Sequence, residues 1–135
     1  MFKFLCDECE VIIAISLDYY TEIPYIYAMD IIFIETPEFV RKFDRIASQD
    51  EMIDLQRDLI ENPMKGSLVQ GTGGARKIRM RMPGRGKSGG ARIIYYFVDL
   101  RGEIWLLDVY LKSDKDTLAS SEKQKLFTFI KEKIL

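Results

Sequence analysis

The 135-residue chain contains no histidine and only two cysteines. Histidine is the commonest general base of enzymes and the commonest metal ligand of proteins. Its absence excludes Ser–His and Cys–His nucleophile pairs. Cys6 and Cys9 form a C-x-x-C pair, but a zinc site needs about four ligands, and no third cysteine or histidine completes one. We therefore expect neither a metal ion nor a cofactor.

Long apolar segments are also absent. The longest runs are Val11–Ile15 and Ile31–Ile34, whereas a membrane-spanning helix needs about 20 residues. The first run follows Asp7, Glu8 and Glu10 instead of basic residues, which is unlike a secretory signal. The length suits one domain with a modest core. We expect a cytoplasmic protein.

Acidic residues are missing from a long internal segment, between Asn62 and Asp99. Eight basic residues lie there: Lys65, Arg76, Lys77, Arg79, Arg81, Arg85, Lys87 and Arg92. The chain has 20 basic and 21 acidic residues, so 12 basic and 21 acidic residues remain elsewhere, a formal charge of −9. Such polarisation causes self-repulsion and predicts a polyanionic partner. A solvated basic surface is the alternative.

Within this segment Lys77, Arg79 and Arg81 alternate with three apolar residues. A period of two predicts a half-buried strand whose cations share one face. Neighbouring Cα atoms on that face are about 6.7 Å apart, twice the strand rise, which suits successive phosphates. The pattern places the functional site on this strand.

Local signals predict the remaining elements. Thr36-Pro37 is typical of a helix start, and Ser48 with Glu51 forms a capping box for a second helix. We expect strands at 31–35, about 75–82, 91–98 and 103–112, and a last helix capped by Ser121. The order β-α-α-β-β-β-α predicts an α+β domain with a small antiparallel sheet. Tyr96 and Tyr110, on the later strands, are weak candidates for base stacking.

Residues 1–28 differ from the rest in being acidic and rich in tyrosine. We expect them to be an extension and residues 29–135 to be the functional domain, with Met29 as the biological start. The alternative is an additional strand or helix packed on the domain. The mass of protein made from the native gene would distinguish the two.

The segment Gly84–Gly89 matches G-x-G-x-x-G. That dinucleotide-binding fingerprint requires a following helix, whereas an apolar strand follows here, so nucleotide binding is not indicated. A flexible connection between strands explains the glycines. On such a loop, Arg85 and Lys87 could close over an RNA backbone.

Three segments, residues 73–79, 84–96 and 106–112, resemble the RelE/ParE toxin superfamily. Within it they are most similar to the HigB-type branch of bacterial type II toxin–antitoxin systems. The resemblance extends over about residues 30–135. It implies a compact, microbial-RNase-like α+β fold. It also implies an endoribonuclease that enters the ribosomal A site, cuts translated mRNA and is neutralised by a cognate antitoxin protein.

RelE-type catalysis uses cations on the first strand of the meander, an arginine opening the next and a basic residue after the last. The resemblance assigns these roles to Lys77, Arg79, Arg92 and Lys112. A tyrosine that some members carry falls at Leu118, which leaves that role unfilled. Backbone contacts to rRNA or mRNA are expected from Arg76, Arg81, Arg85 and Lys87.

The chemistry of the residues agrees with this resemblance. RNA can be cleaved without metal when its own 2′-hydroxyl attacks in line and leaves a cyclic phosphate. Preorganised cations stabilise the charge that develops on the phosphorane. Like charges crowded around a lysine favour its neutral form, so we assign Lys77 as the base. Arg79 and Arg92 would hold the phosphate, and Lys112 the phosphate or the leaving oxygen.

Two other functions remain open. A ParE-like toxin would bind DNA gyrase and cut no RNA, and it needs no cationic catalytic strand. A non-catalytic RNA-binding module would bind with strong salt dependence but leave transcripts intact.

Overall fold

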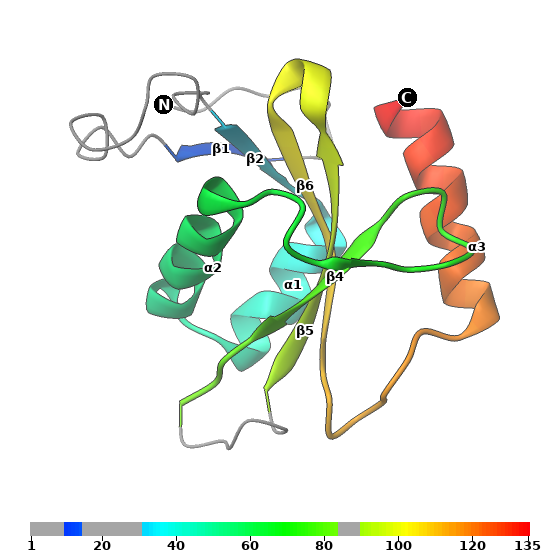
Figure 1. Ribbon diagram of the computed structural model, residues 1–135. Helices are drawn as coiled ribbons and strands as arrows, with labels where there is room; N and C mark the ends of the chain where they lie inside the picture. The colour runs from blue at the N-terminus through cyan, green and yellow to red at the C-terminus, as the bar shows by residue number, and fades with distance from the viewer. Residues whose placement is uncertain (1–9, 15–30, 84–89) are drawn as a thin grey trace.

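The computed structural model describes residues 10–14, 31–83 and 90–135 (Figure 1). For residues 10–14 only the backbone is described. The elements are β1 (Glu10–Ala14), β2 (Ile31–Glu35), α1 (Pro37–Ile46), α2 (Gln49–Glu61), β3 (Ser67–Leu68), β4 (Arg76–Met80), β5 (Ala91–Val98), β6 (Glu103–Leu111) and α3 (Ser120–Phe129). A 3₁₀ turn (Asp99–Arg101) joins β5 to β6, and a π-helical turn (Ile130–Ile134) continues α3. The predicted α+β class and order are confirmed, with β1 and the two-residue β3 in addition.

The six strands of the described residues form one sheet in the order β1-β2-β6-β5-β4-β3. All neighbouring pairs are antiparallel, as predicted, except β2 and β6, which are parallel. Two helices and three strands separate β2 from β6 along the chain, so no hairpin turn makes them run in opposite directions. The strand β1 lies within the expected extension and pairs with β2 at the sheet edge. The start at Met29 stays a prediction.

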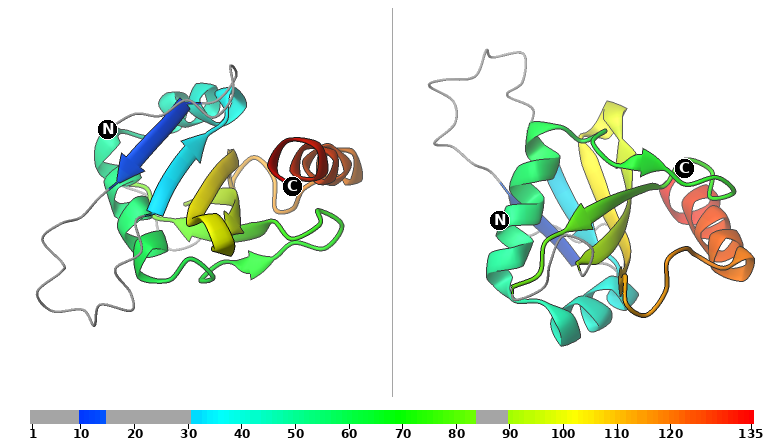
Figure 2. Two further views of the ribbon diagram at one scale, coloured as in Figure 1. Left: turned by 90° about the horizontal axis from the view of Figure 1, so that it is seen from above. Right: turned by 60° about the horizontal axis from the view of Figure 1, so that its bottom comes forward.

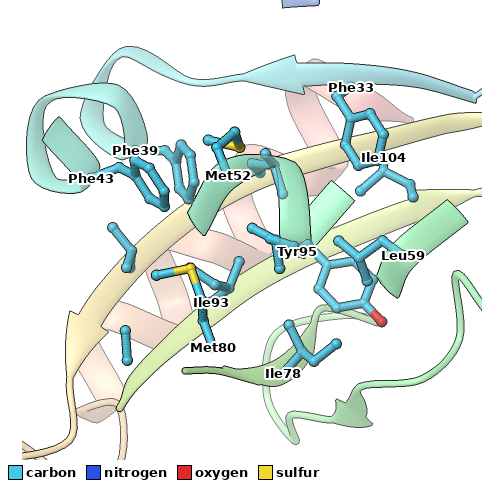
Figure 3. Close-up of a cluster of buried hydrophobic side chains, with 14 of the residues drawn as sticks. Phe33, Phe39, Phe43, Met52, Leu59, Ile78, Met80, Ile93, Tyr95 and Ile104 are labelled. Carbon is cyan, nitrogen blue, oxygen red and sulfur yellow. The ribbon is translucent and has the colours of Figure 1, made fainter. Parts of the chain in front are cut away.

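Helices cover both faces of the sheet. The helices α1 and α2 lie on one face and α3 lies on the other (Figures 1 and 2). The larger core lies beneath α1 and α2, where Phe39, Phe43 and Leu59 pack against Ile93 and Tyr95 of β5 (Figure 3). The smaller core lies beneath α3. It contains Ile34, Ile94, Trp105, Leu107, Leu126, Ile130 and Ile134.

The start of α1 is attached to β6 by one buried residue. Thr36 is the predicted N-cap, and its Oγ1 accepts a hydrogen bond from the backbone N–H of Phe39 (3.2 Å). The same hydroxyl lies 3.3 Å from the carbonyl oxygens of Leu106 and Leu107, and the N–H of Thr36 donates to Leu106 (3.2 Å). The cap therefore orients the helix against the strand that continues into the site.

The other helix starts follow the same chemistry. The capping box of Ser48 and Glu51 is confirmed. The prediction that Ser121 caps the last helix was wrong: the N-cap is Ala119, two residues earlier, and α3 begins at Ser120. The N–H of Ala119 donates to the carboxylate of Glu122 (2.9 Å), which satisfies an otherwise unpaired donor of the first turn. Within the described ranges, no helix is long and apolar enough to cross a bilayer.

Candidate functional site

The sheet face beneath α3 carries a row of polar side chains across three strands. Arg79 of β4 is the register partner of Arg92 of β5, and Arg92 is the partner of Tyr110 of β6. Register partners point to the same face, with Cβ atoms about 5 Å apart. Two cations and a phenol therefore stand side by side, although Arg79 and Tyr110 are far apart in the chain.

Lys77 stands one step along the same face. It lies two residues before Arg79, so their Cα atoms are about 6.7 Å apart. Its register partner on β5 is Ile94, whose partner on β6 is Asp108. The row beside the two arginines thus begins with a lysine and ends with a carboxylate.

Lys112 directly follows the end of β6. It lies two residues after Tyr110, so a continued strand would put both side chains on the same face. Its backbone N–H donates to the carbonyl of Gly90 (3.1 Å). Gly90 in turn lies so close to β4 that a Cβ atom there would be 2.4 Å from the carbonyl oxygen of Met80. A side chain would not fit, so only glycine allows the three strands to approach at this end of the site. The strand register therefore puts Lys77, Arg79 and Arg92 on one sheet face, and the bond to Gly90 fixes the backbone of Lys112 at the end of that face. Their catalytic roles stay predictions.

These cations differ in their exposure to solvent. Arg79 is exposed, Lys77 and Lys112 are half-buried, and Arg92 is only 6% exposed. A buried guanidinium is ordinarily paired with a carboxylate. Within residues 31–83 and 90–135, however, no acidic side chain forms an ion pair with Arg92, whose one hydrogen bond is to the carbonyl of Ala91 (3.3 Å). Among the described residues, Arg92 is thus a buried cation without a carboxylate at ion-pair distance.

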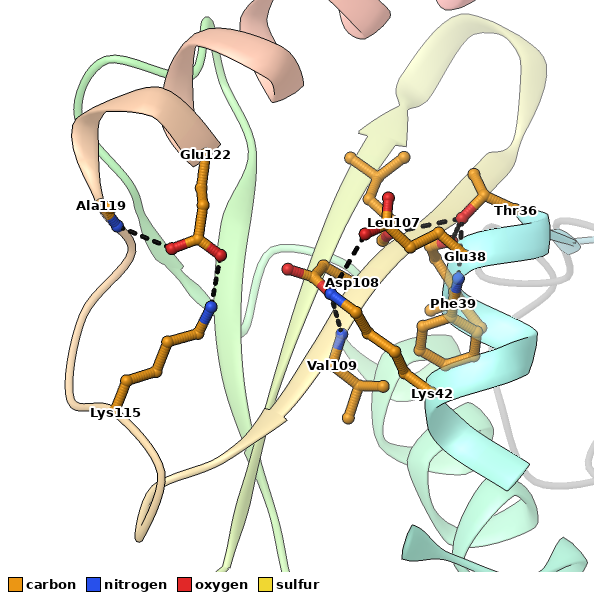
Figure 4. Close-up of polar contacts among 11 residues, drawn as sticks. Thr36, Glu38, Phe39, Lys42, Leu107, Asp108, Val109, Lys115, Ala119 and Glu122 are labelled. Atoms are coloured by element: carbon orange, nitrogen blue, oxygen red, sulfur yellow. Dashed lines mark hydrogen bonds and ion pairs between the residues drawn. The ribbon is translucent and has the colours of Figure 1, made fainter. Parts of the chain in front are cut away.

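Tyr110 completes the row as a buried group, 7% exposed, so its ring is not the open stacking surface considered above. The Nζ atom of Lys115 lies 4.9 Å from the centre of this ring. Lys115 also forms an ion pair with Glu122, the residue that caps α3 (Figure 4). Burial raises the pKa of the Tyr110 phenol, while the nearby Arg92 opposes that effect. Sequence reasoning missed Lys115, and no local pattern identifies it, because it lies in an irregular segment after β6.

A second ion pair closes the side of the site next to α1. Asp108 is 7% exposed, and its Oδ1 accepts hydrogen bonds from Lys42 Nζ (2.8 Å) and the N–H of Val109 (2.9 Å; Figure 4). Burial opposes the charged form of Lys42, but its pairs with Asp108 and Glu38 (3.1 Å) prevail and raise its pKa. Lys42 therefore neutralises the carboxylate nearest to Lys77 in register.

Arg76 is not part of this face. Its register partner is Tyr95, on the side of α1 and α2, and its guanidinium donates to the carbonyls of Gly66 (2.7 Å) and Met64 (3.2 Å). The hydroxyl of Tyr95 holds the same loop through Gly66 N–H (2.9 Å) and the carbonyl of Pro63 (2.8 Å). Arg76 lies two residues before the buried Ile78 and four before the buried Met80, so the period of two puts all three on the same side of the strand. The sequence pattern alone was therefore enough to separate Arg76 from the cationic face.

The other predicted RNA-binding residues are placed only in part. Arg81 is exposed and follows β4, two residues after Arg79. Arg85 and Lys87 lie outside the described residues, as does the Cys6–Cys9 pair. In the part of the chain that the structure describes, no three acidic or cysteine side chains come together as a metal site requires.

Comparison with known proteins identifies the fold. No protein-family model matches the chain. A solved structure of the E. coli toxin RelE, a double-arginine mutant in the free state, superposes with a TM-score of 0.51. The match covers 69% of this chain and 93% of that chain, at 16% sequence identity. The chain has the RelE toxin fold. At this identity the likeness concerns the fold alone, and in this RelE-like fold the cationic row lies on β4, β5 and β6.

Proposed function

We propose that this protein is the toxin of a bacterial type II toxin–antitoxin system, of the RelE type and its HigB branch. In this proposal it is an endoribonuclease that cleaves mRNA on the ribosome and so inhibits translation. The observation that carries the proposal is the buried Arg92, which lies between Arg79 and Tyr110 without a carboxylate partner among the described residues. A cation desolvated in this way suits the stabilisation of an anionic transition state.

The proposed reaction needs no metal ion. Lys77 takes the proton of the 2′-hydroxyl, and the resulting oxyanion attacks the adjacent phosphorus in line. Arg79 and Arg92 bind the non-bridging oxygens, whose charge grows in the phosphorane. The bond from phosphorus to the 5′ oxygen then breaks, and Lys112 stabilises or protonates that oxygen. The products are a 2′,3′-cyclic phosphate and a free 5′-hydroxyl.

The difference in solvent exposure supports different roles for the exposed and the buried cations. Arg79 and Arg81 are exposed beside the buried Arg92, so they can meet a polyanion before the scissile phosphate is seated. Residues outside the 62–99 segment carry a formal charge of −9. This negative charge would repel RNA from much of the remaining surface. The same basic face suits an acidic segment of a cognate antitoxin, which would compete with RNA for it.

Mapping of transcript ends after induction tests the proposal. Wild-type protein should produce new 5′ ends inside translated reading frames and stop growth. Arg79→Met should remove most of this cleavage, because it removes one phosphate ligand from an exposed position without opening the core. Arg57→Met is the matched control: Arg57 is also exposed but lies on α2, beyond the opposite face, and its loss should change nothing.

The two alternatives predict different results in the same experiment. Growth arrest with intact transcripts would contradict the nuclease and favour a ParE-like gyrase inhibitor. Binding to RNA without cleavage would favour a non-catalytic module. The log–log dependence of its affinity on salt should then have a slope of about −0.7 for each single-stranded phosphate neutralised.

A further inference from the structure

The hydroxyl of Tyr110 has an unusual environment. It is buried and, among the residues described, has no hydrogen-bond partner. The other deeply buried tyrosine of β5 and β6, Tyr95, bonds through its hydroxyl to both Pro63 and Gly66. A buried hydroxyl without a partner destabilises a fold and is rare in native proteins. Phenylalanine would fill the same space without that cost. The presence of the hydroxyl therefore indicates that it binds a ligand.

The position of the hydroxyl indicates the kind of ligand. Tyr110 is the register partner of Arg92, which is in turn the partner of Arg79. Arg92 is also the neighbouring charge that acts most strongly on the phenol, ahead of Asp108 and Glu122. A group bound between a phenolic donor and a guanidinium must offer acceptor oxygens and negative charge, which a phosphate does.

We propose that the Tyr110 hydroxyl donates a hydrogen bond to a non-bridging oxygen of the scissile phosphate and is a fifth group of the catalytic site. This inference rests on the proposed nuclease function. Because burial raises the pKa of the phenol, the hydroxyl keeps its proton at neutral pH and serves as a donor, not as a base. The bond would shorten as charge grows on the phosphorane, so it would favour the transition state over the bound substrate.

A lysine side chain covers one side of the Tyr110 ring. Lys115 lies over the ring of Tyr110 and is held by Glu122, and the two paired side chains are 30% and 32% exposed. Ion pairs this exposed contribute little to stability, so an RNA phosphate can compete with Glu122 for Lys115. Substrate binding would then draw the ammonium group off the ring and open the path to the hydroxyl.

The test compares Tyr110→Phe with Tyr95→Phe, since each removes one buried hydroxyl from β5 or β6. Purified variants are assayed for thermal unfolding and for cleavage of mRNA on programmed ribosomes. Tyr110→Phe should cleave about 100-fold more slowly, as loss of one oxyanion donor does, with an unchanged KM and a melting temperature at or above that of the wild type. Tyr95→Phe should melt at a lower temperature but cleave at the wild-type rate while folded.

Each other outcome overturns the inference. Wild-type cleavage by Tyr110→Phe would show that the hydroxyl takes no part in the reaction. A lower melting temperature together with slower cleavage would show that the hydroxyl has a structural partner, and its catalytic role would fall. If wild-type protein leaves mRNA intact in the same assay, the nuclease function itself fails and this inference fails with it.

Discussion

Replacement of Arg92 by methionine should make the protein more stable and inactive. Methionine fills the space of the arginine side chain up to Nε and removes the charge, whereas alanine would open a larger cavity in a site that is 6% exposed. Among the described residues the guanidinium donates one hydrogen bond, to the carbonyl of Ala91, and its register partner on β4 is the like-charged Arg79. Its contribution to folding should therefore be unfavourable.

The magnitudes follow from these contacts. Like charges directly opposite in a sheet are destabilising, and we take for this repulsion the roughly 0.2–1 kcal/mol that favourable cross-strand pairs contribute. The lost hydration of the guanidinium adds to this. We expect Arg92→Met to raise the free energy of unfolding by about 1 kcal/mol, which shifts the melting temperature of a chain of this size by about 4 °C. Cleavage should fall by about 100- to 1000-fold, because a preorganised donor to the developing charge is lost.

Denaturant unfolding and ribosome-dependent cleavage measure the two effects on the same protein, with Arg57→Met as the control that should alter neither. Arg92→Ala should likewise abolish growth inhibition without unfolding the protein. A large loss of stability in Arg92→Met would show that the arginine holds the fold together. Undiminished cleavage by that folded variant would remove Arg92 from the mechanism. Either result would refute the reasoning.

Three further predictions concern the surroundings of the site. Lys42→Met leaves the buried carboxylate of Asp108 without its cation, so denaturant titration should show a loss of about 1–3 kcal/mol; an unchanged midpoint would mean that solvent already screens Asp108. Gly90→Ala places a Cβ atom 2.4 Å from the Met80 carbonyl, so both the melting temperature and cleavage should fall, and a wild-type melting curve would show that the strands separate freely there. The ion pair with Lys115 and the bond from Ala119 lower the pKa of Glu122 below its ordinary value of 4.5. Its contribution to stability is therefore present above that value and is lost as the pH falls through the lowered pKa, and Glu122→Gln should lack this part of the acid dependence when unfolding is followed across acidic pH. Parallel curves for wild type and variant would contradict the assignment.

Local chemistry made much of the fold predictable. Thr36-Pro37 and the capping box at Ser48 locate helix starts through hydrogen bonds that span three residues, so neighbouring positions are enough to identify them. The alternation around Arg79 identified β4 and its cationic face because side chains on a strand repeat every two residues. The same alternation separates Arg76 from that face, although we expected Arg76 to bind the RNA backbone.

Register and burial, by contrast, depend on residues far apart in the chain. The parallel pairing of β2 with β6, and the ion pair between Lys42 and Asp108, arise only when distant segments pack together. The sequence by itself determined which residues are cationic, which strand they occupy and which side of it they share. Only the tertiary structure decided that Arg92 is buried and that the hydroxyl of Tyr110 is left without a partner among the described residues, because desolvation is a property of the packed neighbours and not of the local chain.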